Sequence, residues 1–97
     1  MIIEFEADQG YQSVLSAIDA YKNRLKSSIA RTRRNLANFE DRYGIDTDFF
    51  VAHMTAEDLA GGDLEYVEWA GEAQLLAGLE TELVELEKAR FELPGLP

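Results

Sequence analysis

Apolar residues recur at steps of three and four along the first half of the chain. They stand at Leu15, Ile18, Leu25, Ile29, Leu36, Phe39 and Tyr43. Lys22 and Thr32 fill the two gaps in this series, where they either weaken the packing locally or fix its register. Such spacing places one apolar stripe along a helix, and a heptad-like repeat is typical of helices that pack side by side. The pattern therefore predicts a long helix over residues 8–43, which Gly44 ends.

The second half of the chain carries another apolar stripe at helical spacing. Its positions are Trp69, Leu76, Leu79, Leu83, Leu86 and Leu93, and Leu64, Val67 and Leu75 widen it. Asp63 is the expected N-cap, and acidic side chains in the following turns suit the positive end of the helix dipole. Pro94 is expected to halt the helix, because proline has no backbone N–H to donate. The pattern predicts a second helix over residues 63–93.

The segments outside these two stripes are short. Residues 44–62 are predicted to form a short helical connection, in which Asp46 or Thr47 can cap a first turn. Residues 1–7 are predicted to be an extended strand, because apolar and acidic side chains alternate there. Asp8 would then cap the first long helix.

Together the elements predict one all-α domain over residues 1–97. Two long helices joined by a short connection form an antiparallel hairpin of coiled-coil type. Two helices alone leave one side of each apolar stripe in water, so we expect a partner. The simplest partner is a second copy, giving a homodimer with a four-helix bundle, and a complex with a different protein is the alternative.

Charge is distributed unevenly along the chain. It has 19 acidic and nine basic side chains, for a net charge of −10. Seven of the basic residues lie between Lys22 and Arg42, and thirteen of the acidic residues follow Gly44. Pairing between the two helices is therefore expected to use many of these charges. The acidic excess disfavours nucleic acid, whose phosphates it repels, and suits a basic protein as partner.

Composition also narrows the location and the chemistry. The chain has no cysteine, which excludes disulfides and thiolate sites and fits a reducing cytoplasm. No apolar run approaches the roughly 18 residues that a membrane span requires, and no signal peptide is expected. The single histidine, His53, stands beside Phe49 and Phe50 and is expected to pack against them. We therefore predict a cytoplasmic protein with no catalytic residue, no metal and no cofactor.

One alternative to that expectation is a magnesium site. Glu65, Glu68 and Glu72 share one side of the second helix, as in the E-x-x-E pattern of all-α nucleotide pyrophosphohydrolases. Such sites need a matching acidic pair on a facing helix, for which Glu40 and Asp41 are the candidates. This hypothesis predicts an Mg²⁺-dependent enzyme, whereas the simpler interpretation is a solvated acidic helix start.

Two segments resemble a group of small prokaryotic helical proteins. The first is FEDRYGIDTDFF, residues 39–50, and the second is GGDLEYVEWA, residues 61–70. Members of that group look like antitoxin-type components of toxin–antitoxin pairs. The resemblance implies a non-enzymatic interaction protein that masks a basic partner. It also implies partner or junction roles for Asp63, Glu68 and Trp69.

The candidate partner-binding residues are these three and the leucines of the second stripe. The leucines are Leu76, Leu79, Leu83 and Leu86. For Trp69 the alternative is packing in the core against Phe49 or Phe50, since a buried tryptophan is a large apolar contributor. The competing hypothesis for the whole chain is a self-assembling structural coiled-coil protein without a second kind of partner.

Overall fold

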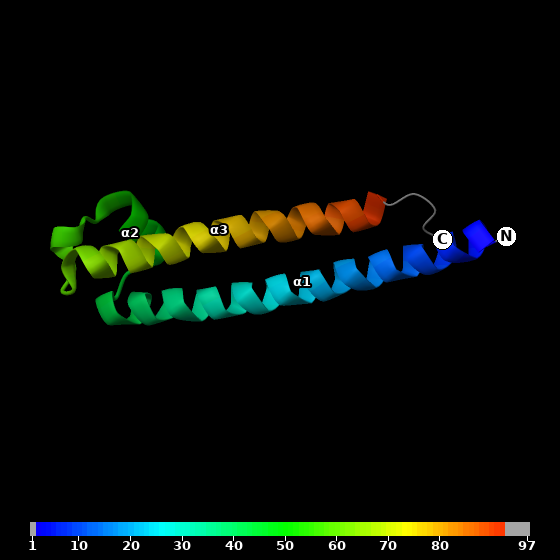
Figure 1. Cartoon of the computed structure of the whole chain (residues 1–97). Helices are drawn as coiled ribbons and strands as arrows, with labels where there is room; N and C mark the ends of the chain where they lie inside the picture. Colours follow the sequence, from blue (N-terminus) through cyan, green and yellow to red (C-terminus); the bar gives the residue numbers. More distant parts are fainter. Residues whose placement is uncertain (1, 93–97) are drawn as a thin grey trace.

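The computed structural model describes residues 2–92. The helical segments, in order, are α1 (Ile2–Tyr43), α2 (Thr47–His53), a single 3-10 turn η1 (Ala56–Asp58) and α3 (Gly62–Glu92). α1 and α3 run side by side in opposite directions, and α2 and η1 connect them at one end (Figure 1). The molecule measures 67 × 18 × 17 Å. The predicted all-α hairpin is confirmed, and the dimer stays a prediction.

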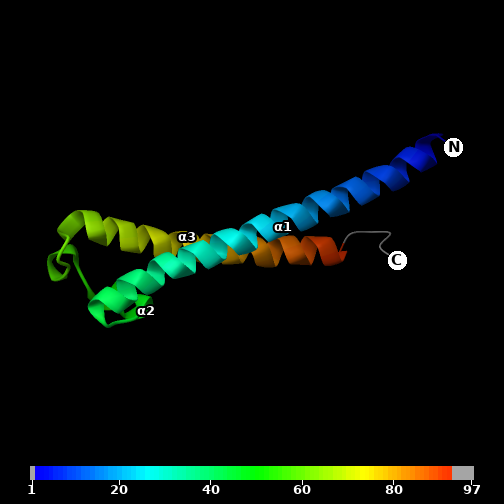
Figure 2. The ribbon, with the colours of Figure 1, turned by 90° about the horizontal axis from the view of Figure 1, so that it is seen from below.

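The predicted N-terminal strand is wrong. α1 begins at Ile2 and continues unbroken to Tyr43, so Asp8 lies inside the helix instead of capping it. A few alternating residues cannot separate a period of two from the first turns of an amphipathic helix. A helix that has already nucleated extends cheaply, because each further residue adds one backbone hydrogen bond. The first turns of α1 extend beyond the end of α3, which α1 crosses at an angle (Figure 2).

The end of α1 and the start of α2 follow the predicted local chemistry. Gly44 has a φ of +68° and its N–H donates to the carbonyl of Glu40 over 2.8 Å, which confirms it as the stop of α1. Asp46 caps α2 by accepting the N–H of Phe49 at 2.8 Å. The predicted N-cap at Asp63 is wrong: α3 begins at Gly62, whose φ of +64° suits glycine, and Asp63 lies inside the first turn. The predicted end of this helix, at residues 93 and 94, lies outside the described residues.

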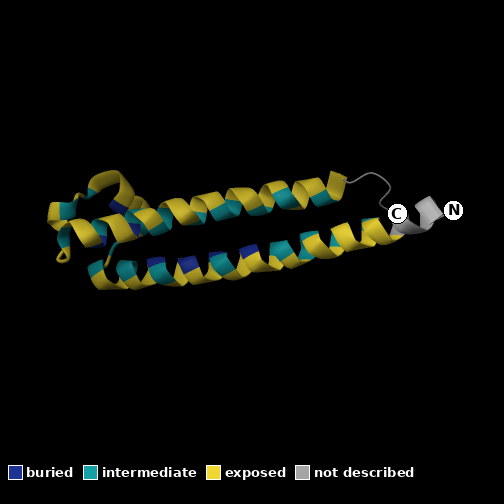
Figure 3. Cartoon of the chain, in the orientation of Figure 1, coloured by how far each residue is buried: buried dark blue, intermediate teal, exposed yellow. Residues whose placement is uncertain are grey.

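The core lies at the junction end of the hairpin. Trp69 is fully buried and stacks on Phe50, with the ring centroids 3.9 Å apart and the planes at 3°. Phe39 and Tyr43 of α1 stack around the same indole at 5.2 and 5.6 Å. α2 and η1 thus widen the hairpin at one end, which lets an aromatic cluster be excluded from water there. Elsewhere the buried positions follow the side of α1 that faces α3 (Figure 3).

Away from the junction the hairpin is thin and its edges are polar. Charged side chains pair across it: Lys22 with Glu87 at 3.6 Å, Arg90 with Asp19 at 2.9 Å, and Arg33 with Glu80. This confirms the predicted pairing between the helices. These pairs are largely exposed and set the orientation of the helices more than their stability, at about 0–1 kcal/mol each.

Both polar residues in the stripe of α1 have partners. Lys22 belongs to the ion pairs at the edge, and Thr32 is buried while its hydroxyl donates to the carbonyl of Ser28 at 2.8 Å. Satisfied groups of this kind do not carry the penalty of an unpaired buried donor. Within residues 2–92, neither long helix has a stretch apolar enough to cross a membrane.

Candidate partner-binding surface

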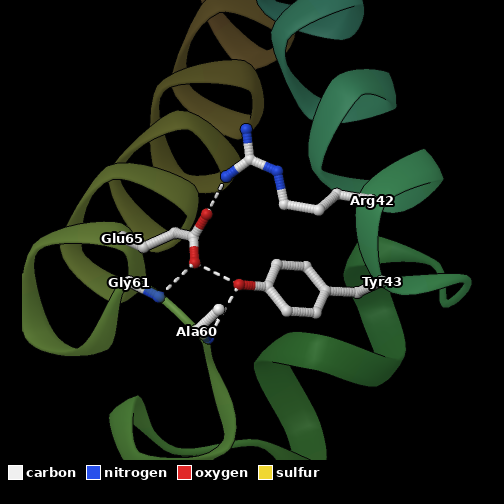
Figure 4. A network of polar contacts seen from close by, with 5 residues as sticks. All are labelled: Arg42, Tyr43, Ala60, Gly61 and Glu65. Atoms are coloured by element: carbon white, nitrogen blue, oxygen red, sulfur yellow. Dashed lines mark hydrogen bonds and ion pairs between the residues drawn. The ribbon is translucent and has the colours of Figure 1, made fainter.

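A network around Glu65 ties the end of α1 to the start of α3. Glu65 is 7% exposed, and its carboxylate accepts hydrogen bonds from the Tyr43 hydroxyl, the Arg42 guanidinium and the Gly61 N–H (Figure 4). The Tyr43 oxygen in turn accepts the N–H of Ala60 at 3.0 Å. The Tyr43 hydroxyl, then the Gly61 N–H and Arg42, hold the pKa of Glu65 below its ordinary value. Glu65 is therefore a structural group of the junction.

The acidic series considered for magnesium is not brought together. Glu65 is occupied by the junction, and Glu68 is exposed on α3. Glu72 uses one oxygen to accept the side-chain amide of Asn35 at 2.9 Å. Glu40, the candidate on the facing helix, instead accepts the backbone N–H of Thr47 at 2.8 Å. Across the described residues, no three histidine or acidic side chains converge as a metal ion would require.

The residues predicted to bind a partner separate into three groups. Asp63 and Glu68 are exposed, Trp69 is buried in the aromatic cluster, and the leucines are half-buried along the hairpin. The half-buried leucines are Leu76, Leu79, Leu83 and Leu86. The half-buried side of α3 faces α1 (Figure 3), so these leucines line the interior of the hairpin. Trp69 packs in the core against Phe50, which was the alternative to a partner contact, and its side chain has no exposed surface in the single chain.

A second apolar surface lies on the outside of α3. Leu64, Val67 and Leu75 are 71%, 65% and 49% exposed, respectively. Their spacing places them on one helix face together with Gly71, where a Cβ would meet nothing within 4 Å. We call Leu64, Val67, Glu68, Gly71 and Leu75 the outer patch. Large apolar side chains that gather on one exposed face mark interaction sites more often than chance.

The apolar residues of the outer patch were identified in the sequence, but the sequence did not indicate that they are exposed. Leu64, Val67 and Leu75 were predicted to widen a single stripe on α3. The structure instead divides the apolar residues between a half-buried side, which faces α1, and a more exposed side, part of which lines a cleft with α1. A helix that is apolar over much of its circumference has no one preferred face, so its periodicity does not indicate which side a neighbour covers.

A cleft of about 560 Å³ between α1 and α3 includes part of the outer patch. Val67, Glu68 and Leu75 of α3 line it, and Asn35 of α1 faces them. Glu72 also lines this cleft, and its Oε2 atom is buried with no hydrogen-bond partner in the described part of the chain. The cleft therefore combines apolar walls with two carboxylates.

A wider groove of about 880 Å³ lies between α1, α2 and α3. Its lining includes Ala70, Ala73 and Ala77 of α3 and Phe50 of α2. These alanines are smaller than the apolar residues of the outer patch, and Ala70 and Ala73 are half-buried. Ala77 is itself exposed, and it therefore offers a control position on α3 away from the patch.

Comparison with known proteins gave no matching family model and no similar curated sequence or solved structure.

Proposed function

We propose that this chain is a non-enzymatic protein–protein interaction module of antitoxin type, which masks a basic partner protein. The observation that carries the proposal is the outer patch. Leu64, Val67 and Leu75 expose apolar area on a helix whose charged side chains are mostly acidic. Complete burial of one such side chain contributes about 1.5–3 kcal/mol, so a partner that covers all three gains a substantial part of its affinity there.

The charge of α3 supports a basic partner. The helix has nine acidic and two basic side chains. Several acids are used within the hairpin, but the side chains of Asp63, Glu68 and Glu85 form no hydrogen bond or ion pair with other described residues. Opposite charge steers association, while the apolar contacts hold the complex together. High salt should therefore slow association with the partner more than it speeds dissociation.

The resemblance of residues 39–50 and 61–70 to antitoxin-type proteins supports the same role. Both segments lie at the junction, and residues 61–70 include the start of α3 with Leu64, Val67 and Glu68 of the outer patch. Masking the active surface of a basic protein requires affinity and shape, with no catalytic group. The proposal covers masking in the cytoplasm and assigns no DNA-binding role.

Self-assembly is the second candidate, favoured by the basic outer side of α1. Arg31 and Arg34 are exposed and form no ion pair with other described residues. A second copy could set these cations against the acidic α3 of the first copy and complete a four-helix bundle. The protein would then be a structural homodimer with no second kind of chain.

The experiment that separates the two candidates is a pull-down of the tagged chain from its native cell, followed by mass spectrometry and sizing. We expect one small basic protein in stoichiometric amount. Leu75→Asp should abolish its recovery, because a charge would be buried in the interface without a partner. The matched control is Ala77→Asp, which adds the same charge on another side of α3. Recovery of the chain alone as a uniform oligomer would contradict masking and favour self-assembly.

Gly71→Ala should stabilise the free chain and weaken the complex. Glycine inside a helix costs about 0.5–1 kcal/mol relative to alanine, and the new Cβ would meet nothing within 4 Å. The same methyl group would stand in the path of a partner that packs closely on the outer patch. Urea denaturation measures the gain, and titration with the recovered partner measures the loss.

Gly10→Ala is the control for this prediction. It also lies inside a helix with open space around its Cβ, but on α1, far from the outer patch. It should raise stability by a similar amount and leave partner binding unchanged. Equal effects of Gly71→Ala and Gly10→Ala on binding would show that no partner approaches α3 closely at Gly71.

A further inference from the structure

Glu72 has one satisfied and one unsatisfied carboxylate oxygen. Oε1 accepts the side-chain amide of Asn35 at 2.9 Å. Oε2 is buried, and no donor within residues 2–92 reaches it. Buried acceptors in native proteins are almost always hydrogen-bonded, so Oε2 lacks the donor that such an atom usually has, and a donor entering the cleft that Glu72 lines could supply it.

Glu68 stands one helical turn before Glu72 on α3. Residues four apart are neighbours on a helix surface, and both carboxylates line the same cleft. Glu68 is exposed and has no polar partner in the described part of the chain. Arg42 also lines the cleft, but it already pairs with Glu65. The cleft thus holds two acids that form no ion pair with a basic side chain in the described part of the chain.

We infer that this cleft receives an arginine side chain of a basic partner, presented by an amphipathic helix whose apolar residues cover the outer patch. The inference rests on the proposed function and specifies the chemistry of the partner. A guanidinium is planar and presents several N–H donors, so one group can bridge Glu68 and the open oxygen of Glu72. A lysine ammonium is a compact and strongly hydrated charge, which fits such a bridge less well.

The shape of the outer patch favours a helix as the element that presents the arginine. Leu64 and Leu75 mark its ends, about 16 Å apart along α3 at 1.5 Å per residue. That length corresponds to about three turns of a second helix. Gly71, between them, lacks a side chain and lets the backbone of the second helix approach. Laying the apolar face of an amphipathic helix against such a surface is a common mode of recognition.

An NMR titration of the ¹⁵N-labelled chain tests the inference even before the native partner is identified. The probe is a synthetic amphipathic helical peptide with leucines on one face and arginines beside them. Matched peptides carry lysine or glutamate in place of arginine. We expect the arginine peptide to shift the Gly71 amide and the Asn35 side-chain amide, to bind more tightly than the lysine peptide, and the glutamate peptide not to bind.

Charge-neutralising variants identify the cleft. Glu68→Gln and Glu72→Gln should each lower the affinity for the arginine peptide about tenfold, as expected for the loss of one charge-assisted hydrogen bond. Glu85→Gln removes the same charge from α3 outside the cleft and should leave the affinity unchanged. Equal weakening by all three variants, or equal binding of the arginine and lysine peptides, would overturn the arginine cleft.

The native partner separates the failure of this inference from the failure of the proposed function. If Leu75→Asp loses the partner while Glu72→Gln retains full affinity, the interaction role stands and the arginine cleft is wrong. If no partner is recovered from the cell, masking is wrong, whereas the peptide titration still decides the preference of the cleft.

Discussion

Trp69→Ala is expected to lower the free energy of unfolding by about 3–5 kcal/mol, the range for deleting a large aromatic side chain from a core. The indole is fully buried and contacts aromatic rings from both neighbouring helices: Phe50 of α2, and Phe39 and Tyr43 of α1. The variant would leave a cavity where three helices meet, and rigid rings fill such a space poorly. Urea denaturation followed by far-UV circular dichroism measures the change.

The consequence of this substitution should be large for this protein in particular. The total free energy of unfolding of a small domain is about 5–15 kcal/mol, and the rest of this thin hairpin has little core to compensate for the loss. Val67→Ala is the control, because Val67 is 65% exposed and should change stability by less than about 0.5 kcal/mol. A loss below about 1 kcal/mol for Trp69→Ala would show that the aromatic cluster does not hold the junction.

Acid should weaken the junction through Glu65. The Tyr43 hydroxyl, the Gly61 N–H and Arg42 lower the pKa of Glu65 from 4.5 in the folded chain. The carboxyl group therefore loses its proton at a lower pH in the folded chain than in the unfolded one. The stabilisation is therefore fully present above about pH 4.5 and is lost as the pH falls through the lower, folded-state pKa. Thermal unfolding is measured at pH values from 7 to 3, and we expect the midpoint temperature to decrease once the pH is below about 4.5.

Glu65→Gln tests whether this one carboxylate is responsible. The variant should be much less stable than the parent at pH 7, because Arg42 loses its partner and an amide accepts the Tyr43 hydroxyl less well. The difference between parent and variant should shrink as the pH falls, since the parent then loses the same charge. Glu85→Gln is the matched control and should show no such convergence. A constant difference across the pH range would contradict the assignment.

Much of the hairpin was predictable because its determinants are local. The heptad-like stripe of the first half, the glycine at position 44 and the cap at Asp46 each act within a few residues of their own position. The pairing of charges across the hairpin is not local, but it was predictable because oppositely charged side chains meet once the two helices are antiparallel. The prediction of an N-terminal strand was wrong because residues 1–7 are too few to define a period, and α1 includes residues 2–7.

The roles of the acidic residues in the candidate partner-binding surface could be assigned only from the tertiary structure. Glu65, Glu68 and Glu72 have the same residue type and regular spacing, yet one is buried in the junction, one is exposed, and one carries an open oxygen in a cleft. Their differences arise from groups distant in sequence, such as Tyr43 and Asn35, which only the folded chain brings near.

The sequence by itself determined that two long, oppositely charged helices form an all-α hairpin, because helix periodicity, caps and stops are local properties. Only the tertiary structure decided which apolar residues of α3 face inward. α3 has apolar side chains on more than one side, and the angle at which α1 crosses it selects the buried ones. The outer patch is what that selection leaves in solvent, and the proposed function therefore rests on packing that no pattern in the sequence specifies.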